Sequence, residues 1–312
     1  MKTIFECLSN ELLIHLFEYF STDELFGLFY NLNIRLNNLI ESHFHLNYST
    51  EQSHHSSLIS LSFPYIRHLS IRTIFPNNKL KKFTNLRSLH LDYLTDDLIH
   101  EIKQMDFSQL EYLYLNHKIH PFYMFDMRQL IFSNFFSNLK FCYISRMNLS
   151  GLSNSQTCYS LRYLKLNEIN GQIYVFILSS CPNLNSFQFK FNTKSPCPRN
   201  SICHLNLKSL NINMLSDDWP WNDEILDEYF RCIPNIEQLK ISRTISTNVN
   251  LVNYDWLSSI LSSRFLFLEQ FHLKFYLNRS QGFFNKRIMS IEFKRQFSSI
   301  YKYQYQYQLV VF

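Results

Sequence analysis

The sequence predicts an α/β chain in which a short helical module at the amino end precedes a long array of strand-and-helix repeats. Three observations support this fold class. A short leucine pattern returns nine times along the body, helix-capping residues recur within the first forty positions, and 46% of the 312 residues are hydrophobic while only 18% are charged. This balance supplies a core and excludes a disordered polyelectrolyte.

Glycine content and charge exclude several function classes. The chain holds only four glycines, namely Gly27, Gly151, Gly171 and Gly282. They stand too far apart to build a phosphate-binding loop, which excludes dinucleotide and P-loop sites. The whole +5 net charge lies in residues 279–312, where six bases accompany one acid. Because the body is neutral, we expect no nucleic-acid partner, and the Tyr/Gln-rich tail fits an exposed strand or a disordered end.

Capping signals divide residues 8–40 into three short helices. Ser9 or Asn10 can cap a helix that reaches about Phe20. Ser21 or Thr22 precedes the start of the second helix, and Asn31 or Asn33 could begin the third. The apolar side chains of the first helix span an arc of about 220°, roughly twice what a surface helix needs. A unit of about 40 residues is also near the lower size limit for unaided folding. We therefore predict that residues 1–46 bury one side on the rest of the chain and another on a different protein.

The same residues resemble the F-box motif. The match covers residues 8–13, 16–21, 23–25 and 35–40, and it departs from the usual pattern at Ser9, where proline is common, and at Leu36, where tryptophan is common. The resemblance implies docking to the Skp-type adaptor of a cullin-based SCF ubiquitin ligase. By position it implies an adaptor interface made of Leu8, Glu11, Leu12, Leu16 and Phe17. The alternative interpretation is that these are ordinary core residues of a helical cap.

A serine- and histidine-rich segment, residues 47–62, marks a linker, and the repeats occupy residues 63–278. The repeat pattern is F-x-N-L-x-x-L-x-L. Its first leucine-type positions are Ile66, Leu86, Leu110, Leu139, Leu161, Leu184, Leu207, Ile236 and Leu268. The steps between them run from 20 to 32 residues, and asparagine directly precedes this position in five copies. Helical patterns follow the strands at residues 95–105 and 217–230.

This pattern resembles leucine-rich repeats, which implies an irregular solenoid with a parallel sheet lining its concave face. Positions that alternate with the leucines should then point outward. The outward residues that we single out as a substrate-binding patch are Tyr112, Tyr114, Tyr143, Tyr163 and Lys165. Tyrosines beside cations are typical of interface hot spots, although an aromatic-rich chain also places tyrosines on ordinary exposed strands.

No catalytic signature is present, and we predict neither enzymatic activity nor a cofactor. Cys197, Cys203 and His204 lack a second ligand pair at finger spacing, so no metal site is predicted. Seven cysteines without compact spacing, no signal peptide and no membrane span together predict a cytoplasmic or nuclear protein.

Taken with the F-box resemblance, these features predict a substrate-recognition subunit of an SCF ubiquitin ligase. The adaptor would bind the amino-terminal helices and a target protein would bind the concave face. The alternative is a leucine-rich-repeat scaffold with no role in ubiquitin transfer. The sequence does not identify the target.

Overall fold

The computed structural model describes residues 7–42, 46–50, 63–73, 80–116, 121–145, 157–191, 203–214, 223–245, 263–277 and 304–311, with Ser259 and Leu261. The chain forms two compact units. The first contains residues 1–130 and 135–140, and the second contains residues 131–134 and 141–312. The boundary therefore falls inside the repeat array, and the helical module shares a unit with the first strands.

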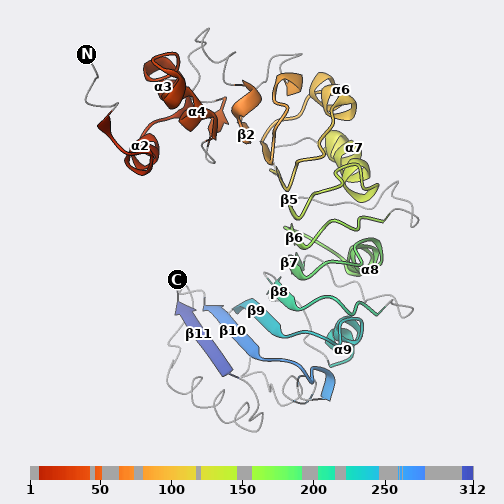
Figure 1. Cartoon of the computed structure of the whole chain (residues 1–312). Coiled ribbons are helices and arrows are strands. Elements are labelled where there is room, and N and C mark those ends of the chain that lie inside the picture. The colour runs from red at the N-terminus through yellow and green to blue at the C-terminus, as the bar shows by residue number, and fades with distance from the viewer. Residues whose placement is uncertain are drawn as a thin grey trace. The chain divides into compact units, whose positions relative to one another are not determined.

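The three predicted amino-terminal helices are present as α2 (Asn10–Phe17), α3 (Thr22–Leu28) and α4 (Ile34–Ser42) (Figure 1). Each begins at a predicted capping residue. The Ser9 hydroxyl accepts a hydrogen bond from the Leu12 amide, Ser21 forms a capping box with Glu24, and Asn33 Oδ1 accepts from the Leu36 amide at 2.9 Å. The first helix ends at Phe17, three residues earlier than predicted.

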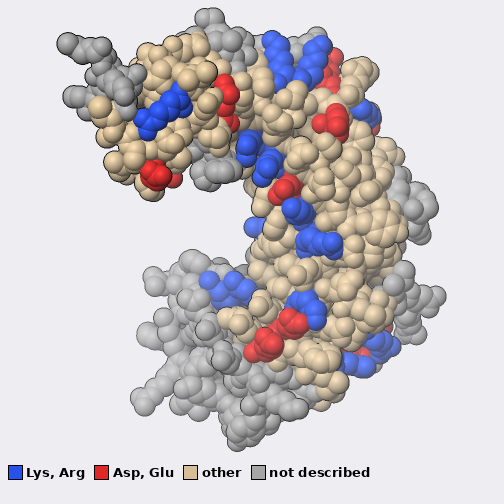
Figure 2. Space-filling model, viewed as in Figure 1, with Lys and Arg blue, Asp and Glu red and all other residues tan. Residues whose placement is uncertain are grey.

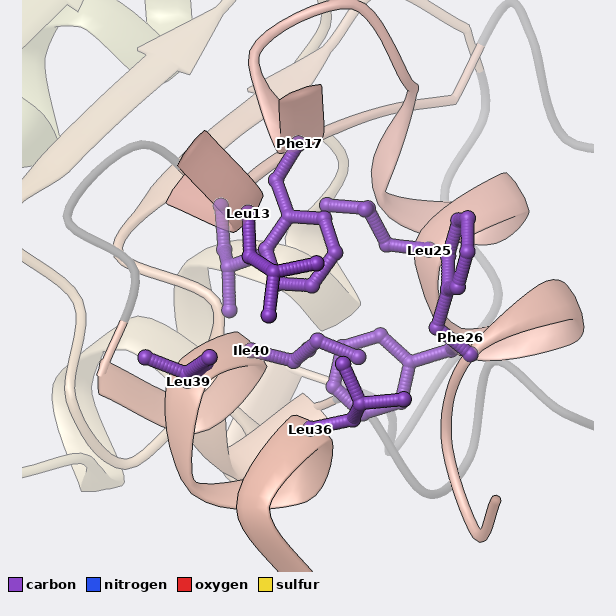
Figure 3. Packing of buried hydrophobic residues seen from close by; sticks show 9 residues of the cluster. Leu13, Phe17, Leu25, Phe26, Leu36, Leu39 and Ile40 are labelled. Carbon is purple, nitrogen blue, oxygen red and sulfur yellow. The ribbon is translucent and has the colours of Figure 1, made fainter. Parts of the chain in front are cut away.

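These helices enclose a small hydrophobic core of their own (Figure 3). Its buried residues are Leu13, Phe17, Leu25, Phe26, Phe29, Leu36, Leu39, Ile40 and Leu46. Leu36, at the position where the F-box pattern usually has tryptophan, is 2% exposed, so leucine fills this part of the core. Tyr65, which follows the module in sequence, packs against the same cluster and joins the helices to the first strands.

The sheet of the first unit is parallel and follows chain order. Its strands are β1 (Asn47–Ser49), β2 (His68–Ile71), β3 (Ser88–Leu91) and β4 (Tyr112–Leu115). Short helices η1 (Phe63–Tyr65) and η2 (Leu80–Lys82) and helix α6 (Asp96–Gln104) connect them, and α7 (Pro121–Phe132) crosses into the second unit. The predicted linker is wrong at its start, because residues 47–49 pair with β2; its residues 51–62 lie outside the described part.

The second unit is also parallel and in chain order. Its strands are β5 (Phe141–Ile144), β6 (Tyr163–Leu166), β7 (Ser186–Phe191), β8 (Ser209–Met214), β9 (Gln238–Ile245), β10 (Gln270–Leu277) and β11 (Gln304–Val311). Helices α8 (Gly171–Ser180) and α9 (Asp223–Arg231) lie on one side of these strands (Figure 1). Strand β11 extends the sheet into the predicted tail, while the start predicted for α9 at residue 217 lies outside the described residues.

Burial confirms the repeat as the organising element of the strands in both units. All nine first leucine-type residues are at most 3% exposed. Strands β2, β3, β6 and β8 alternate half-buried with buried side chains, as a sheet with helices on one face requires. The fold is therefore an irregular leucine-rich-repeat array behind a three-helix module. The face of each sheet that lies opposite its helices is called the open face below.

The structure explains why asparagine precedes the first leucine in five copies. Every one of these side-chain amides donates a hydrogen bond to a backbone carbonyl of the preceding copy, at the same repeat position. The donor and acceptor pairs are Asn85 to Pro64, Asn138 to Ser108, Asn183 to Tyr159, Asn206 to Pro182 and Asn235 to Leu205. The asparagine is thus a hydrogen-bonded bridge between successive repeats. In two of these copies it follows by two residues a ring that packs on the preceding copy, Phe83 on Phe63 and Phe136 on Phe107.

Removing one such bridge should have a measurable cost. In Asn206→Ala the Pro182 carbonyl loses its donor, at 2.8 Å in the wild type, and we expect a loss of about 1 kcal/mol in the free energy of unfolding. Urea denaturation of the full chain measures it. Asn185→Ala is the matched control, because the Asn185 side chain is exposed and makes no hydrogen bond within the described residues. Equal stability of the two variants would contradict the bridging role.

Candidate interaction surfaces

The helical module carries apolar side chains that its own core does not cover. The large hydrophobic residues concerned, with their exposed fractions, are Leu12 (56%), Ile14 (36%), Tyr19 (84%), Leu28 (56%), Leu32 (64%) and Ile34 (79%). These residues lie on α2, on α3, in the turns that follow them and, for Ile34, at the start of α4. An exposed apolar group of this density is typical of a surface that binds another protein.

Helix α2 divides its broad apolar arc between two environments. Leu13 and Phe17, four residues apart, are fully buried, while Leu12 and Leu16 lie on one exposed flank and Ile14 emerges on the opposite flank. The predicted adaptor interface is wrong for Phe17. Its ring is 0% exposed and packs 5.5 Å from the ring of Phe29, so it has no surface to offer a partner.

The remaining predicted adaptor residues are accessible. Glu11 and Leu12 are exposed, Leu8 is half-buried against the module core, and Leu16 is half-buried. Arg35 fixes the start of this surface, because its Nη2 donates to the Leu8 carbonyl at 2.6 Å and its Nε donates to Asn10 Oδ1 at 2.9 Å. The arginine of α4 thereby holds the amino end of α2 in place.

The opposite side of the module packs on the first strands of the sheet. The Thr22 hydroxyl donates to the Asn47 carbonyl at 2.5 Å, and the Phe26 ring stacks on Tyr65 at 6.2 Å. The Tyr30 hydroxyl donates to Glu41 at 2.9 Å, and this hydrogen bond, followed by desolvation, raises the pKa of Tyr30 well above its usual value. One side of the module therefore covers the edge of the sheet.

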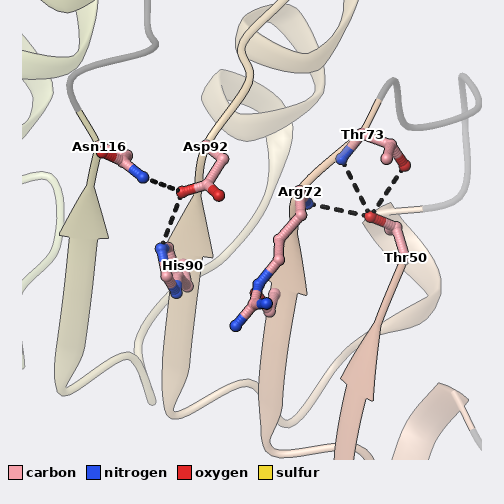
Figure 4. Close-up of polar contacts among 7 residues, drawn as sticks. Thr50, Arg72, Thr73, His90, Asp92 and Asn116 are labelled. Atoms are coloured by element: carbon pink, nitrogen blue, oxygen red, sulfur yellow. Dashed lines mark hydrogen bonds and ion pairs between the residues drawn. The ribbon is translucent and has the colours of Figure 1, made fainter. Parts of the chain in front are cut away.

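A polar cluster lies at the carboxyl ends of strands β3 and β4 in the first unit (Figure 4). Asp92 is 6% exposed, and its Oδ1 lies 3.0 Å from His90 Nε2 and 2.6 Å from Asn116 Nδ2. Burial lowers the pKa of His90. The nearby Asp92 raises this pKa and Arg72 lowers it, and the net shift is downward. The neutral ring donates to Asp92 and stands 4.1 Å from the Tyr114 ring, so the cluster orients side chains on the open face.

Thr50 completes this edge beside β1. Its hydroxyl oxygen accepts hydrogen bonds from the Arg72 amide at 2.9 Å and from the Thr73 amide at 3.2 Å (Figure 4). The contact pairs chain just beyond β1 with chain just beyond β2, and it satisfies amides that the short edge strand leaves open. Its role is structural, because it holds the ends of β1 and β2 together.

The predicted substrate patch is divided between the units. Tyr112, 42% exposed, and the half-buried Tyr114 lie on the open face of the first unit. Tyr143, Tyr163 and Lys165 lie together on the open face of the second, where Lys165 Nζ stands 5.2 Å from the centre of the Tyr143 ring.

The three residues in the second unit are fixed by neighbouring side chains. The Tyr163 hydroxyl donates to Gln188 Oε1 at 3.1 Å, and its ring lies 5.9 Å from the 38% exposed ring of Phe141. Burial raises the pKa of Tyr163, so its hydroxyl stays protonated and able to donate. The cluster presents an aromatic surface with an adjacent cation.

The cations of this open face extend further than the leucine pattern indicated. Lys190 and Lys274 lie beyond the consensus positions, because β7 has six residues and β10 has eight where the pattern predicted short strands. Figure 2 shows lysine and arginine side chains recurring at the surface of the molecule in this view. The leucine consensus does not specify how far each strand extends. The register of the paired strands is therefore the information that locates Lys190 and Lys274.

The candidate metal ligands have structural roles or lie outside the described residues. His204 is 4% exposed; its Nδ1 accepts from the Leu207 amide at 3.1 Å, so its Nε2 carries the proton and donates to the Cys181 carbonyl at 2.8 Å. Cys203 is exposed, and Cys197 is not described. No metal-binding group of histidine, cysteine or acidic side chains occurs among the described residues.

In the described part of the chain, no helix has the length and apolar character needed to cross a bilayer. This finding concerns helices alone.

Similarity to known proteins is found among solved structures. No protein-family model matches the sequence, and no curated protein matches it. Among solved structures the chain is similar to the leucine-rich repeat-containing protein LegL7 from Legionella pneumophila, with 14% sequence identity and a TM-score of 0.42. That match covers 85% of this chain and 91% of LegL7. Strand register and burial within the chain itself show the repeat fold.

Proposed function

We propose that this protein is a substrate-recognition subunit of a cullin-based SCF ubiquitin ligase. In this proposal the exposed side of the helical module binds the Skp-type adaptor, and the open face of the repeats binds a target protein. The chain itself performs no chemistry. It raises the local concentration of target lysines near a conjugating enzyme carried by another subunit. The role implies a cytoplasmic or nuclear location.

The observation that carries the proposal is the two-sided character of the module. A cap for the sheet needs only the side that packs on Asn47 and Tyr65. Capping leaves unexplained why Leu12, Tyr19 and Ile34 are more than half exposed. Covering one such leucine is worth about 1.5–3 kcal/mol, so a second polypeptide would gain substantially by binding there. The residues that resemble the F-box motif include Leu12 and the accessible Leu8, Glu11 and Leu16.

The alternative is a leucine-rich-repeat scaffold whose amino-terminal helices serve only as a cap. The contacts of Thr22 with Asn47 and of Phe26 with Tyr65 are those expected of a cap. They are equally compatible with a docking module, because docking requires the module to be held rigidly on the repeats. The two functions differ in whether the exposed flank of α2 binds an adaptor.

Capture of a purified Skp-type adaptor by the full chain tests the proposal. We expect Leu12→Asp to weaken capture by about thirtyfold or more, the effect of losing a hot spot of about 2 kcal/mol. Ile14→Asp is the matched control, since Ile14 is also exposed on α2 but on the opposite flank, and it should retain capture. Biolayer interferometry gives the affinities, and circular dichroism checks that both variants remain folded.

Two outcomes would reject the ligase role. The intact chain could fail to capture the adaptor, or the two aspartate substitutions could weaken capture equally. Either result favours the scaffold, with the module as a cap.

A further inference from the structure

We propose that the open face of the second unit binds an extended acidic segment of a partner protein, with two negative groups about four residues apart. The inference rests on the proposed function in one respect, namely that this face receives the target. It adds the chemistry of the target segment, which the tyrosine patch alone does not specify. The occupant is a peptide whose acidic groups are phosphates or carboxylates.

Strand register places four lysines in two parallel rows. Lys165 pairs with Gln188, Gln188 with Asn211, and Asn211 with Lys240, so Lys165 and Lys240 stand in one row three strands apart. The next row runs in the same way from Lys190 on β7 to Lys274 on β10. The two rows are therefore offset by one strand, and each has a cation at both ends.

The outward positions of these strands carry no negative charge. In the two rows, the residues between and beside the lysines are Tyr143, Gln188, Asn211, Asn213, Ser242 and His272. Within the described part of the chain, no carboxylate pairs with Lys165, Lys190 or Lys240. The nearby Lys208 differs, because Glu237 neutralises it at 2.6 Å. Unneutralised cations on a strand face favour an anionic ligand.

The centre of the face also has an open hydrogen-bonding group. Asn211 Oδ1 is buried and has no donor within the described residues, although it lies beside Lys240 in the register. A buried acceptor without a donor requires an explanation. A peptide whose binding turns the Asn211 side chain outward would supply a backbone N–H to this oxygen, between the two lysines of the row.

Strand spacing sets the spacing of the two negative groups. Neighbouring strands lie about 4.8 Å apart, so Lys165 and Lys240 stand about 14 Å apart at the backbone. An extended peptide advances about 3.3 Å per residue, and about four residues therefore separate the two groups that meet these lysines.

A single-stranded nucleic acid is the less favoured occupant. Such a site combines a basic groove with aromatic platforms along its length. Here the aromatic residues Phe141, Tyr143 and Tyr163 belong to β5 and β6, whereas Lys240 and Lys274 lie on β9 and β10 among polar neighbours. Because the lysines and the aromatic rings lie on different strands, this face is better suited to individual lysine contacts with separated acidic groups.

The test uses the full chain and a synthetic Gly/Ser peptide with two phosphoserines four residues apart, followed by fluorescence anisotropy. We expect this peptide to bind about tenfold more tightly than the same peptide with adjacent phosphoserines, and the unphosphorylated peptide not to bind. The double substitution Lys165→Gln and Lys240→Gln should weaken binding about tenfold or more. The control, Lys81→Gln with Lys82→Gln, removes the same charge from exposed positions of the first unit and should retain binding.

Several results would overturn the inference. They are equal binding of phosphorylated and unphosphorylated peptides, equal loss in the two lysine pairs, or tighter binding of an oligouridylate of the same charge. Adaptor capture is measured on the same samples. Lost peptide binding with retained capture would reject this inference alone, and lost capture with retained peptide binding would reject the ligase role while the charge-selective face stands.

Discussion

Replacing Phe17 with alanine is expected to remove about 3–5 kcal/mol from the stability of the helical module. The Phe17 ring is fully buried, lies 5.5 Å from Phe29 and occupies the centre of the core in Figure 3. A unit of this size has little stability to spare. We therefore expect α2, α3 and α4 to lose most of their protection from hydrogen exchange, while the strands of the second unit keep theirs.

Leu12→Ala is the matched control for this experiment. Leu12 is on the same helix but 56% exposed, and its truncation should change stability by no more than about 0.5 kcal/mol. The pair thus separates folding from binding, since we propose that the Leu12 side chain contacts a partner, whereas the Phe17 side chain lies in the core. Unchanged exchange protection in Phe17→Ala would show that the module core is assigned wrongly.

Replacing Tyr174 with alanine should destabilise the second unit by about 3–5 kcal/mol, the usual cost of truncating a buried aromatic residue. Tyr174 is 0% exposed, and its ring lies 4.9 Å from Tyr229 and 5.7 Å from Phe189. Its hydroxyl donates to the Tyr229 carbonyl at 3.0 Å, which joins α8 to α9. Urea denaturation followed by fluorescence measures the loss.

Two further variants divide this effect into its parts. Tyr174→Phe keeps the ring and removes only the hydroxyl, so it should cost about 1 kcal/mol through the unsatisfied Tyr229 carbonyl. Tyr159→Ala removes a tyrosine that is 59% exposed and should be nearly neutral. If the phenylalanine variant were as unstable as the alanine variant, the hydrogen bond and not the packing would dominate.

The two surfaces proposed for binding differ in their physical basis. The module presents apolar side chains, whose affinity for a partner comes from removing them from water. The open face of the second unit presents lysines and amides, whose affinity depends on charge and weakens as salt rises. Under the proposed function, the adaptor would therefore stay bound at salt concentrations at which a charged target dissociates.

Local sequence was sufficient for the elements that local chemistry controls. Ser9, Ser21 and Asn33 start the three helices because a side-chain oxygen can satisfy amides of the first turn without help from the rest of the chain. The spacing of the pattern locates the nine leucine-type positions and shows an asparagine before five of them, but it does not contain the reason for that asparagine. That reason is a carbonyl of the preceding repeat, which a single copy of the pattern does not contain.

Other features were decided only by neighbours distant in sequence. The sequence pattern does not indicate helix α8, because seven of its ten residues are buried. The remaining face, Gln172, Val175 and Ser179, is narrow and includes an apolar residue, so the helical period is weak. Strand β1 begins within a segment of linker composition, and it exists because β2 offers it hydrogen bonds. Strand lengths beyond the consensus, which bring Lys190 and Lys274 onto the open face, also depend on pairing.

The fold class, the positions of the repeats and an apolar surface on α2 too broad for one contact all follow from the amino-acid pattern. The division of that surface, with Phe17 inside and Leu12 outside, follows from the packing of the folded chain, as does the set of outward residues that share a row. The physical reason is that hydrophobic periodicity shows how many faces of a helix or strand are apolar. Whether each face is buried depends on the neighbour that packs against it. That neighbour comes from elsewhere in the chain, or from another protein.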